Sequence, residues 1–212
     1  MMTGAKKWNF SPAGGESLAS DRPMPELRED NLLQRISKGD EPAFLEFYRQ
    51  YQGPVYRFAM QMSGKTELAE EVTQDVFMAA MRSAGEYDAA KGSLMAFLYG
   101  IARNYVMRCL ERERQYTALL NDSDGDQTEL PSFEQSVLDG LTSSERVESL
   151  RKAVLALPPA YREAVVLCDL EELDYAAAAE ALGCAVGTVR SRLHRARALL
   201  AEKMRAGERC TA

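Results

Sequence analysis

Apolar side chains recur every three or four residues through most of the chain, which is the spacing of helices that bury one face. The longest of these runs cover residues 66–83, 94–114 and 174–200. Shorter runs begin near residues 27, 40, 55, 147 and 159. The pattern predicts an all-α fold, and 212 residues are enough for one large or two small domains.

The run 174–200, DYAAAAEALGCAVGTVRSRLHRARALL, predicts two short helices joined by a tight turn. Asp174 is a good N-cap because its carboxylate can accept a hydrogen bond from a free N–H of the first turn. Gly183 stands where a left-handed C-cap is needed, and a second helix begins near Val186. The residues expected to face inward on this second helix are Val189, Leu193, Ala196 and Leu200.

The outer face of the second helix is basic. It carries Arg190, Ser191, His194, Arg195 and Arg197, with Thr188 in the first turn. Two helices with a glycine-containing turn, the second of them basic, predict a helix-turn-helix whose second helix fits the DNA major groove. On charge alone, an ordinary helix pair with a solvated basic face remains an alternative.

In the N-terminal half, Gly39 should end a first helix and Asp40 should cap a second. We expect Gly53 and Pro54 to end this second helix before a third begins near Val55. The second helix should bury an aromatic-rich face that comprises Phe44, Leu45, Phe47, Tyr48 and Tyr51.

The helix predicted over 66–83 has a buried stripe and an opposite, mixed polar face. The polar face carries Glu71, Gln74, Asp75 and Met78 at three- and four-residue steps. Such a face is usually only solvated, but an exposed methionine at its centre is common on surfaces that receive a partner.

A loop over residues 85–93 should precede the helix 94–114, with Ser93 as its cap. Basic and aromatic side chains are interleaved on this helix, with the polar Asn104 among them, at Tyr99, Arg103, Arg108, Arg112 and Arg114. That combination suits single-stranded nucleic acid, whose bases stack on rings while its phosphates meet cations. Alternatively, Tyr99 is simply part of the core.

The charge is unevenly distributed. The net charge is −6 and the pI is about 5.1, so the whole chain should bind free duplex DNA poorly. Residues 190–209 are strongly basic, whereas residues 122–148 are strongly acidic. We therefore expect a flexible acidic linker and a protein that reaches DNA within a larger assembly.

Other classes of protein find little support. Four scattered cysteines and a single histidine, His194, argue against a metal site. We find no nucleotide-binding glycine motif and no nucleophile–base pair, and we predict no enzyme activity and no cofactor. No apolar run approaches the length of a membrane span, and no secretory signal is evident, so we expect a cytoplasmic protein.

Two stretches carry a family resemblance. The order GTV–RSRL–HRAR resembles the promoter-reading region 4 of bacterial sigma factors, particularly the extracytoplasmic-function group of the sigma-70 family. The run ELAEEVTQDVFMAAMRSAGEYDAAKGSLMAFLYGIARN resembles region 2 of the same group. The resemblance implies a factor that binds core RNA polymerase and directs promoter-specific transcription initiation, commonly under the control of an anti-sigma factor.

The resemblance also implies roles for individual residues. Glu71, Gln74, Asp75 and Met78 would dock on the clamp helices of the largest polymerase subunit. Recognition and melting of the minus-ten element would fall to Tyr87, Asp88, Lys91, Ser93, Tyr99, Arg103, Asn104 and Arg108. The upstream minus-thirty-five element would be bound by Thr188, Arg190, Ser191, His194, Arg195 and Arg197, with Arg162 near phosphate.

The expected organisation is a mobile tail (1–26), a region 2 domain (27–116), the acidic linker (117–146), a region 4 helix-turn-helix domain (147–206) and a short tail (207–212). An alternative is a free-standing dimeric helix-turn-helix regulator, which would explain residues 174–200 but not the N-terminal half. A helical adaptor, or an enzyme with a diffuse site, is a third hypothesis. Co-purification with core polymerase, against a symmetric dimer footprint, would separate the first two.

Overall fold

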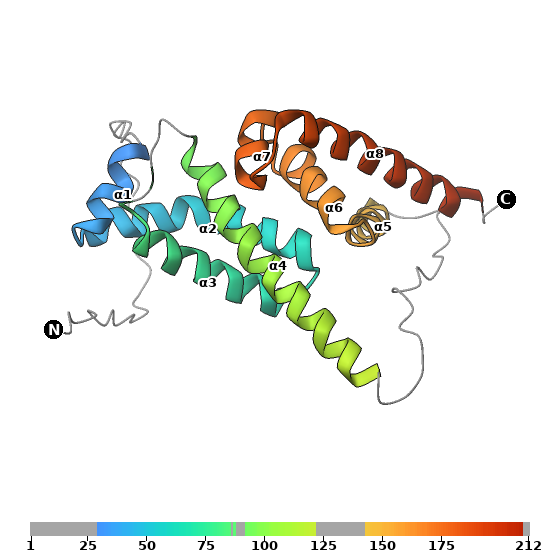
Figure 1. The fold of residues 1–212 in the computed structure, drawn as a ribbon, viewed down its shortest axis with the longest axis horizontal. Helices are drawn as coiled ribbons and strands as arrows, with labels where there is room; N and C mark the ends of the chain where they lie inside the picture. The colour runs from blue at the N-terminus through green and yellow to red at the C-terminus, as the bar shows by residue number, and fades with distance from the viewer. Residues whose placement is uncertain (1–28, 86, 88–91, 122–142, 210–212) are drawn as a thin grey trace.

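Helices make up every regular element of the described residues, which are 29–85, 87, 92–121 and 143–209 of the computed structural model. The N-terminal bundle comprises α1 (Glu29–Ser37), α2 (Glu41–Ser63), α3 (Thr66–Arg82) and α4 (Leu94–Asn121). The C-terminal bundle comprises α5 (Ser143–Leu155), α6 (Pro159–Val165), the π-helical turn η1 (Val166–Leu170), α7 (Tyr175–Leu182) and α8 (Val186–Arg209). Figure 1 shows the two bundles side by side. The predicted all-α class is confirmed.

One predicted helix boundary is wrong. Pro54 lies inside α2, which runs unbroken from Glu41 to Ser63. Proline removes one backbone donor and crowds the preceding turn, but this local cost does not end a helix whose buried face continues. Tyr51 and Val55 are buried on either side of Pro54, so packing on both sides of the proline keeps the helix intact.

The expected caps are present. Asp40 Oδ1 accepts a hydrogen bond from the Ala43 N–H at 3.0 Å, at the start of α2. Asp174 Oδ1 accepts from the N–H groups of Ala176 and Ala177, both at 2.8 Å, at the start of α7. Gly183 ends α7 with φ of 60°, in the left-handed region where a side chain would be strained. The predicted helix-turn-helix, α7–turn–α8, is thus formed.

Aromatic rings fill the core of the N-terminal bundle. Phe47 meets Phe77 edge to face at 5.1 Å between ring centroids, and Phe58 meets Tyr99 at 5.2 Å. The prediction that Leu45 belongs to the core is wrong, because its side chain is exposed on α2. In the C-terminal bundle, Val189, Leu193 and Ala196 of α8 are buried as predicted.

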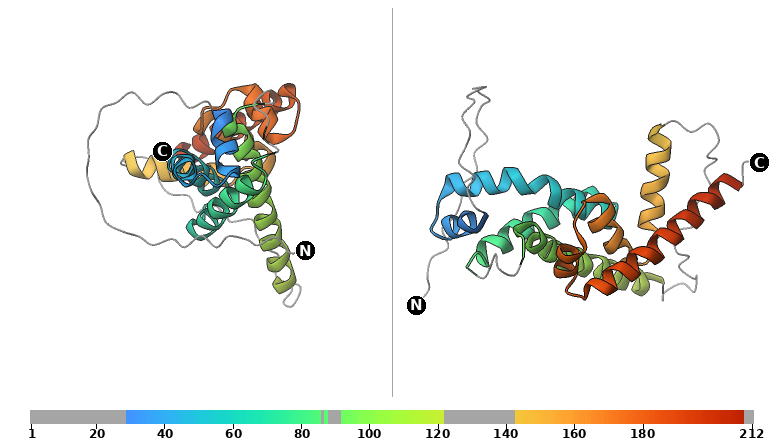
Figure 2. Two further views of the ribbon diagram at one scale, coloured as in Figure 1. Left: turned by 90° about the vertical axis from the view of Figure 1, so that its left-hand side faces the viewer. Right: turned by 90° about the horizontal axis from the view of Figure 1, so that it is seen from above.

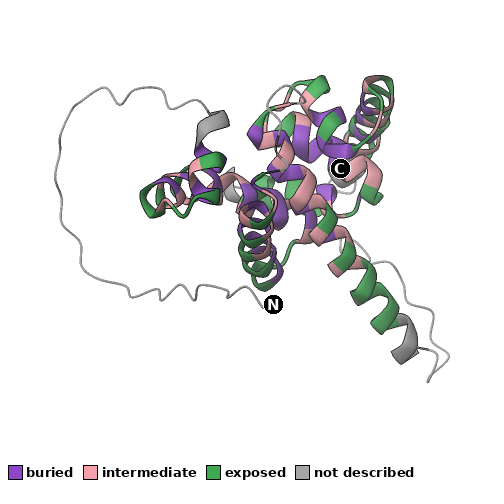
Figure 3. Cartoon of the chain, turned by 60° about the vertical axis from the view of Figure 1, so that its left-hand side comes forward, coloured by how far each residue is buried: buried purple, intermediate pink, exposed green. Residues whose placement is uncertain are grey.

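The two bundles pack against each other. Helix α7 lies on α4, while α5, α6 and η1 contact α2, and the further views in Figure 2 show the same proximity. Residues 111–117 of α4 extend beyond both bundles and are mostly exposed (Figure 3). Helices α4 and α5 occupy the two ends of the predicted linker, residues 117–121 and 143–146, and α8 continues to Arg209. The predicted N-terminal tail and the middle of the linker lie outside the described residues.

Candidate nucleic-acid interface

The recognition helix α8 presents the predicted basic face to solvent. Arg190, Ser191, His194 and Arg195 are exposed, and Thr188 is half-buried in the first turn. The Ser191 hydroxyl donates to the Thr188 carbonyl at 2.9 Å. Because the opposite face of α8 is buried in the C-terminal bundle, the exposed side chains are free to enter a groove.

Two arginines of α8 have partners outside the helix. Arg197 donates through Nη2 and Nε to the carboxylate of Asp169 in η1, at 2.5 and 3.1 Å. The guanidinium of Arg190 lies over the ring of Tyr175, 5.6 Å from its centroid. The side chain of Tyr175 is itself exposed at the start of α7.

Arg103, a predicted strand-binding residue, faces the C-terminal bundle. Its Nε lies 2.7 Å from Oε1 of Glu163 on α6, in poor alignment for a hydrogen bond, while Nη2 donates to Oε2 at 3.4 Å. The side chain of Glu163 is 1% exposed and that of Arg103 is 28% exposed. A buried carboxylate is costly without a partner, so Arg103 supplies the charge that Glu163 needs in this arrangement.

Tyr99, on the preceding turn of α4, is also covered. Its hydroxyl donates to Oε2 of Glu171 at 2.9 Å, and Arg57 of α2 donates to both oxygens of the same carboxylate at 3.2 and 3.4 Å. Burial and the charge of Glu171 raise the pKa of Tyr99 far above its usual value. The structure thus places Tyr99 in the core, the alternative that its sequence position left open.

The loop before α4 is covered by a third carboxylate. Glu180 of α7 packs directly over Gly92, where the Cβ of any other residue would overlap its carboxylate. Partial burial raises the pKa of Glu180. Tyr87 donates its hydroxyl to the Gly92 carbonyl at 3.1 Å, and Ser93 Oγ accepts from the Ala96 N–H at 3.2 Å as the predicted cap. The other predicted loop residues, Asp88 and Lys91, lie outside the described residues.

The remaining predicted strand-binding residues stay accessible. Asn104 and Arg108 are exposed on α4, and Arg108 lies over the ring of Tyr105, 4.5 Å from its centroid. A cleft of about 350 Å³ separates this part of α4 from the end of α7 and includes Phe97, Asn104 and Gly183 in its walls. The accessible residues among those predicted to bind the strand therefore lie next to the contact between the bundles.

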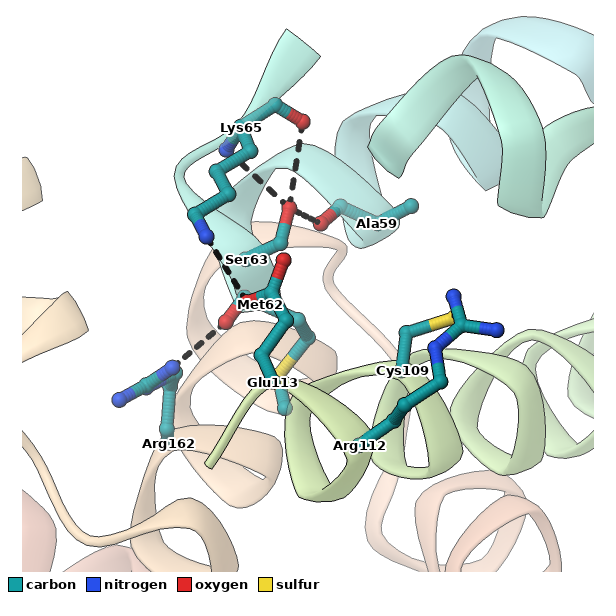
Figure 4. A network of polar contacts seen from close by, with 8 residues as sticks. All are labelled: Ala59, Met62, Ser63, Lys65, Cys109, Arg112, Glu113 and Arg162. Carbon is teal, nitrogen blue, oxygen red and sulfur yellow. Dashed lines mark hydrogen bonds and ion pairs between the residues drawn. The ribbon is translucent and has the colours of Figure 1, made fainter. Parts of the chain in front are cut away.

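Arg162 of α6 bonds backbone carbonyls. Its guanidinium donates to the carbonyl of Met62 in the N-terminal bundle at 2.5 Å (Figure 4). It also donates to the carbonyls of Leu155 and Leu157. Burial lowers the pKa of Arg162. A contact from this side chain to phosphate would require it to leave these carbonyls, so the role implied by the resemblance stays a prediction.

The predicted polymerase-binding residues share one accessible face of α3. Glu71 and Gln74 are exposed, Asp75 is half-buried, and Met78 is 46% exposed. No contact with the C-terminal bundle covers these four side chains among the described interactions. Tyr99 and Arg103 are covered where the two bundles pack against each other, an arrangement that we call closed. The face on α3 stays exposed in this closed arrangement.

Sequence reasoning missed the carboxylates Glu163, Glu171 and Glu180, which lie over the predicted melting surface. Only Glu163 left a sequence signal, because it interrupts an apolar helical run in LPPAYREAVVL. Nothing in the spacing of Glu171 and Glu180 indicated that they would meet distant residues. Tyr99 and Arg57, for example, precede Glu171 by 72 and 114 positions.

Other kinds of site are not supported by the described residues. Those residues contain no cluster of histidine, cysteine and carboxylate groups that could hold a metal ion. Within the same residues, no helix has the length and apolar character needed to cross a membrane.

Comparison with known proteins is consistent across both bundles. A family model described as Sigma-70 region 2 matches residues 47–116, and one described as Sigma-70, region 4 matches residues 147–200. The chain is 34% identical to the ECF RNA polymerase sigma factor SigM of Mycobacterium tuberculosis over 83% of this chain and 84% of that protein. It is 37% identical to SigE of Mycolicibacterium smegmatis, over 74% of this chain but only 59% of the length of SigE.

Solved structures show the same fold. Sigma factor RpoE of Bartonella quintana, in complex with the anti-sigma factor NepR, matches with a TM-score of 0.58 and 28% identity over 76% of this chain and 96% of that one. CnrH, in complex with the cytosolic domain of CnrY, matches with a TM-score of 0.62 and 21% identity over 84% of this chain and 97% of that one.

Region 2 and region 4, joined in one chain, define a sigma factor of the sigma-70 class. The chain belongs to the extracytoplasmic-function group of RNA polymerase sigma factors, a family of transcription initiation factors and not of enzymes. The family predicted from the sequence is confirmed.

Proposed function

We propose that this chain binds core RNA polymerase in the cytoplasm and selects promoters by two separate DNA contacts, with an anti-sigma factor controlling its availability. The observation that carries the proposal is the joint presence of an accessible docking face on α3 and a solvent-facing basic face on α8 in one chain. Neither face alone would distinguish this function from that of a dimeric regulator.

The proposed roles divide between the bundles. Residues 27–116 would bind polymerase through Glu71, Gln74, Asp75 and Met78 and would melt the minus-ten element with the loop and α4. Residues 147–206 would recognise the minus-thirty-five element through the exposed face of α8, and residues 117–146 would link the two domains.

The closed arrangement adds a condition to this proposal. Tyr99 and Arg103 are covered by the C-terminal bundle, so a DNA strand can reach them only when the two bundles separate. Contact with polymerase and promoter would supply the free energy for this separation, because the docking face on α3 is already exposed. An anti-sigma factor that contacts both bundles at once would favour the closed form and keep Tyr99 and Arg103 covered.

The test is transcription in vitro by core polymerase with the purified chain on a library of promoter fragments. We expect transcripts from a subset of fragments that share two short elements, and none from core polymerase alone. Substitution of Asp75 by alanine should reduce activity on all selected promoters equally. A chain that fails to bind core polymerase, or that binds a symmetric operator as a dimer without it, would contradict the proposal.

A further inference from the structure

Arg190 and Arg197 lie two turns apart on α8, and both have partners that belong to other elements. Seven residues of α-helix separate side chains on one face by about 10 Å along the axis. Tyr175, the first residue of α7, contributes the ring beneath Arg190. Asp169, in the π-helical turn, holds Arg197 with two hydrogen bonds.

The two contacts meet at Tyr175. The hydrogen bond to Asp169 raises the pKa of Arg197, and the hydroxyl of Tyr175 adds to this effect. The ring of Tyr175 lies toward Arg190, 5.6 Å from its guanidinium. Since Asp174 fixes the start of α7 through two hydrogen bonds, the position of Tyr175 is set by the cap and not by the recognition helix.

We propose that Tyr175 and Asp169 are positioning residues of the recognition helix: Tyr175 orients Arg190 toward a base edge, and Asp169 withholds Arg197 from the DNA backbone. This inference rests on the proposed function, in which α8 reads the upstream element. An arginine held against an aromatic face loses less rotational freedom when it forms two bonds to guanine. An arginine already paired with a carboxylate of the same protein is less available to phosphate. It therefore contributes less to the part of the binding affinity that is independent of DNA sequence.

Sequence selectivity would thus depend on side chains outside the recognition helix. Arg190 and Arg197 differ in this respect from their neighbours on α8. Ser191, His194 and Arg195 are exposed, and no described contact joins their side chains to a residue of another element. The side chain of Arg195 would stay free to rotate until it contacts a base, whereas the side chain of Arg190 would already be oriented before contact. The π-helical turn matters here because it carries Asp169 toward α8 and is followed at once by Glu171, which points to the other bundle.

The test of the first contact uses holoenzyme and a promoter fragment that wild-type holoenzyme has selected from a random library. Binding is measured on fragments with single base-pair changes in the upstream element. Arg190→Ala should lose discrimination at one base pair by about 5- to 150-fold. Tyr175→Leu should lose about 2- to 5-fold at the same base pair, and Tyr175→Phe, which keeps the ring, should retain it.

The double variant decides whether Tyr175 acts through Arg190. In the Arg190→Ala background, Tyr175→Leu should cause no further loss, since the group that it positions is gone. Tyr116→Leu, on the exposed end of α4, is the matched control and should leave discrimination unchanged. An additive loss, or a uniform loss across all base pairs, would overturn the positioning role. If Arg190→Ala itself leaves discrimination intact, the proposed base-reading role of Arg190 fails first.

The test of the second contact is the salt dependence of holoenzyme binding to duplex DNA that lacks the upstream element. Asp169→Asn should release Arg197 to a phosphate and steepen the slope of log affinity against log salt by about one. Glu172→Gln removes the same charge from an exposed neighbour and should leave the slope unchanged. Equal slopes for wild type and Asp169→Asn would show that Asp169 does not restrain Arg197.

Discussion

The ion pair between Arg103 and Glu163 gives the sharpest prediction about the closed arrangement. Glu163→Gln keeps the shape of the side chain but removes the charge that Arg103 meets at 2.7 Å. A hydrogen bond to a charged group contributes about 1.5–3 kcal/mol, and the partial exposure of Arg103 favours the lower part of this range. A loss of about 2 kcal/mol would shift the ratio of closed to open forms by about 30-fold.

Two measurements on the purified chain should then move in opposite directions. The midpoint of thermal unfolding should fall by several degrees, at about 2–4 °C per kcal/mol for a chain of this size. The apparent affinity for single-stranded DNA should rise by up to about 30-fold, because the binding-competent form is more populated. Glu148→Gln, which removes the same charge from an exposed pair within α5, should change neither. If Glu163→Gln lowers stability without raising the affinity for DNA, the carboxylate only stabilises the fold and does not restrict access to Arg103.

Three further predictions concern other parts of the chain. Asp75→Ala should weaken binding to core polymerase in a titration while leaving the circular dichroism spectrum unchanged, and Glu41→Ala on α2 should have no effect on binding. The raised pKa of Tyr99 means that its neutral form stabilises the closed arrangement. This contribution is fully present below the ordinary tyrosine pKa of about 10 and is lost only as the pH rises through the raised value. The tyrosinate absorbance of wild type and Tyr99→Phe should therefore coincide up to a pH of about 11. Asp174→Ala should lower the free energy of unfolding by about 1 kcal/mol in denaturant titrations. Asp174→Asn should lower it by much less, because asparagine also caps helices. Equal losses in the two variants would show that the hydrogen bonds of the cap do not cause the effect.

The fold was largely predictable because its signals are local. The cap at Asp174, the left-handed glycine at 183 and the 3.6-residue spacing of α8 are all decided within a few residues, and each is observed. Pro54 shows where local reasoning fails. A proline weakens a helix by a fixed local amount, but the continuous burial of α2 on both sides outweighs it, and burial depends on partners that are distant in the sequence.

The candidate site was predictable only in part, for the same reason. The exposed faces of α3 and α8 follow from helical periodicity, so Met78 and Arg195 were placed correctly on solvent-facing stripes. The contact between the bundles does not follow from periodicity. Tyr99 is a plausible DNA-stacking residue by its neighbours in sequence, and only the arrangement in space shows that Glu171 covers it.

The contact between the bundles also explains how an acidic chain can carry a DNA-binding surface. Glu163 and Glu171 satisfy Arg103, Arg57 and Tyr99 while no DNA is present, so these groups are not left as a free basic patch that would attract any nucleic acid. In the proposed function, a promoter strand would have to displace these two carboxylates before it gained the same contacts. Salt screens the exposed part of this contact, such as the side of Arg57 that faces solvent, and so favours opening at the same time as it weakens binding to phosphate. The salt dependence of DNA binding by the free chain should therefore be shallower than the number of phosphate contacts implies, and it should steepen in Glu163→Gln, in which opening no longer compensates.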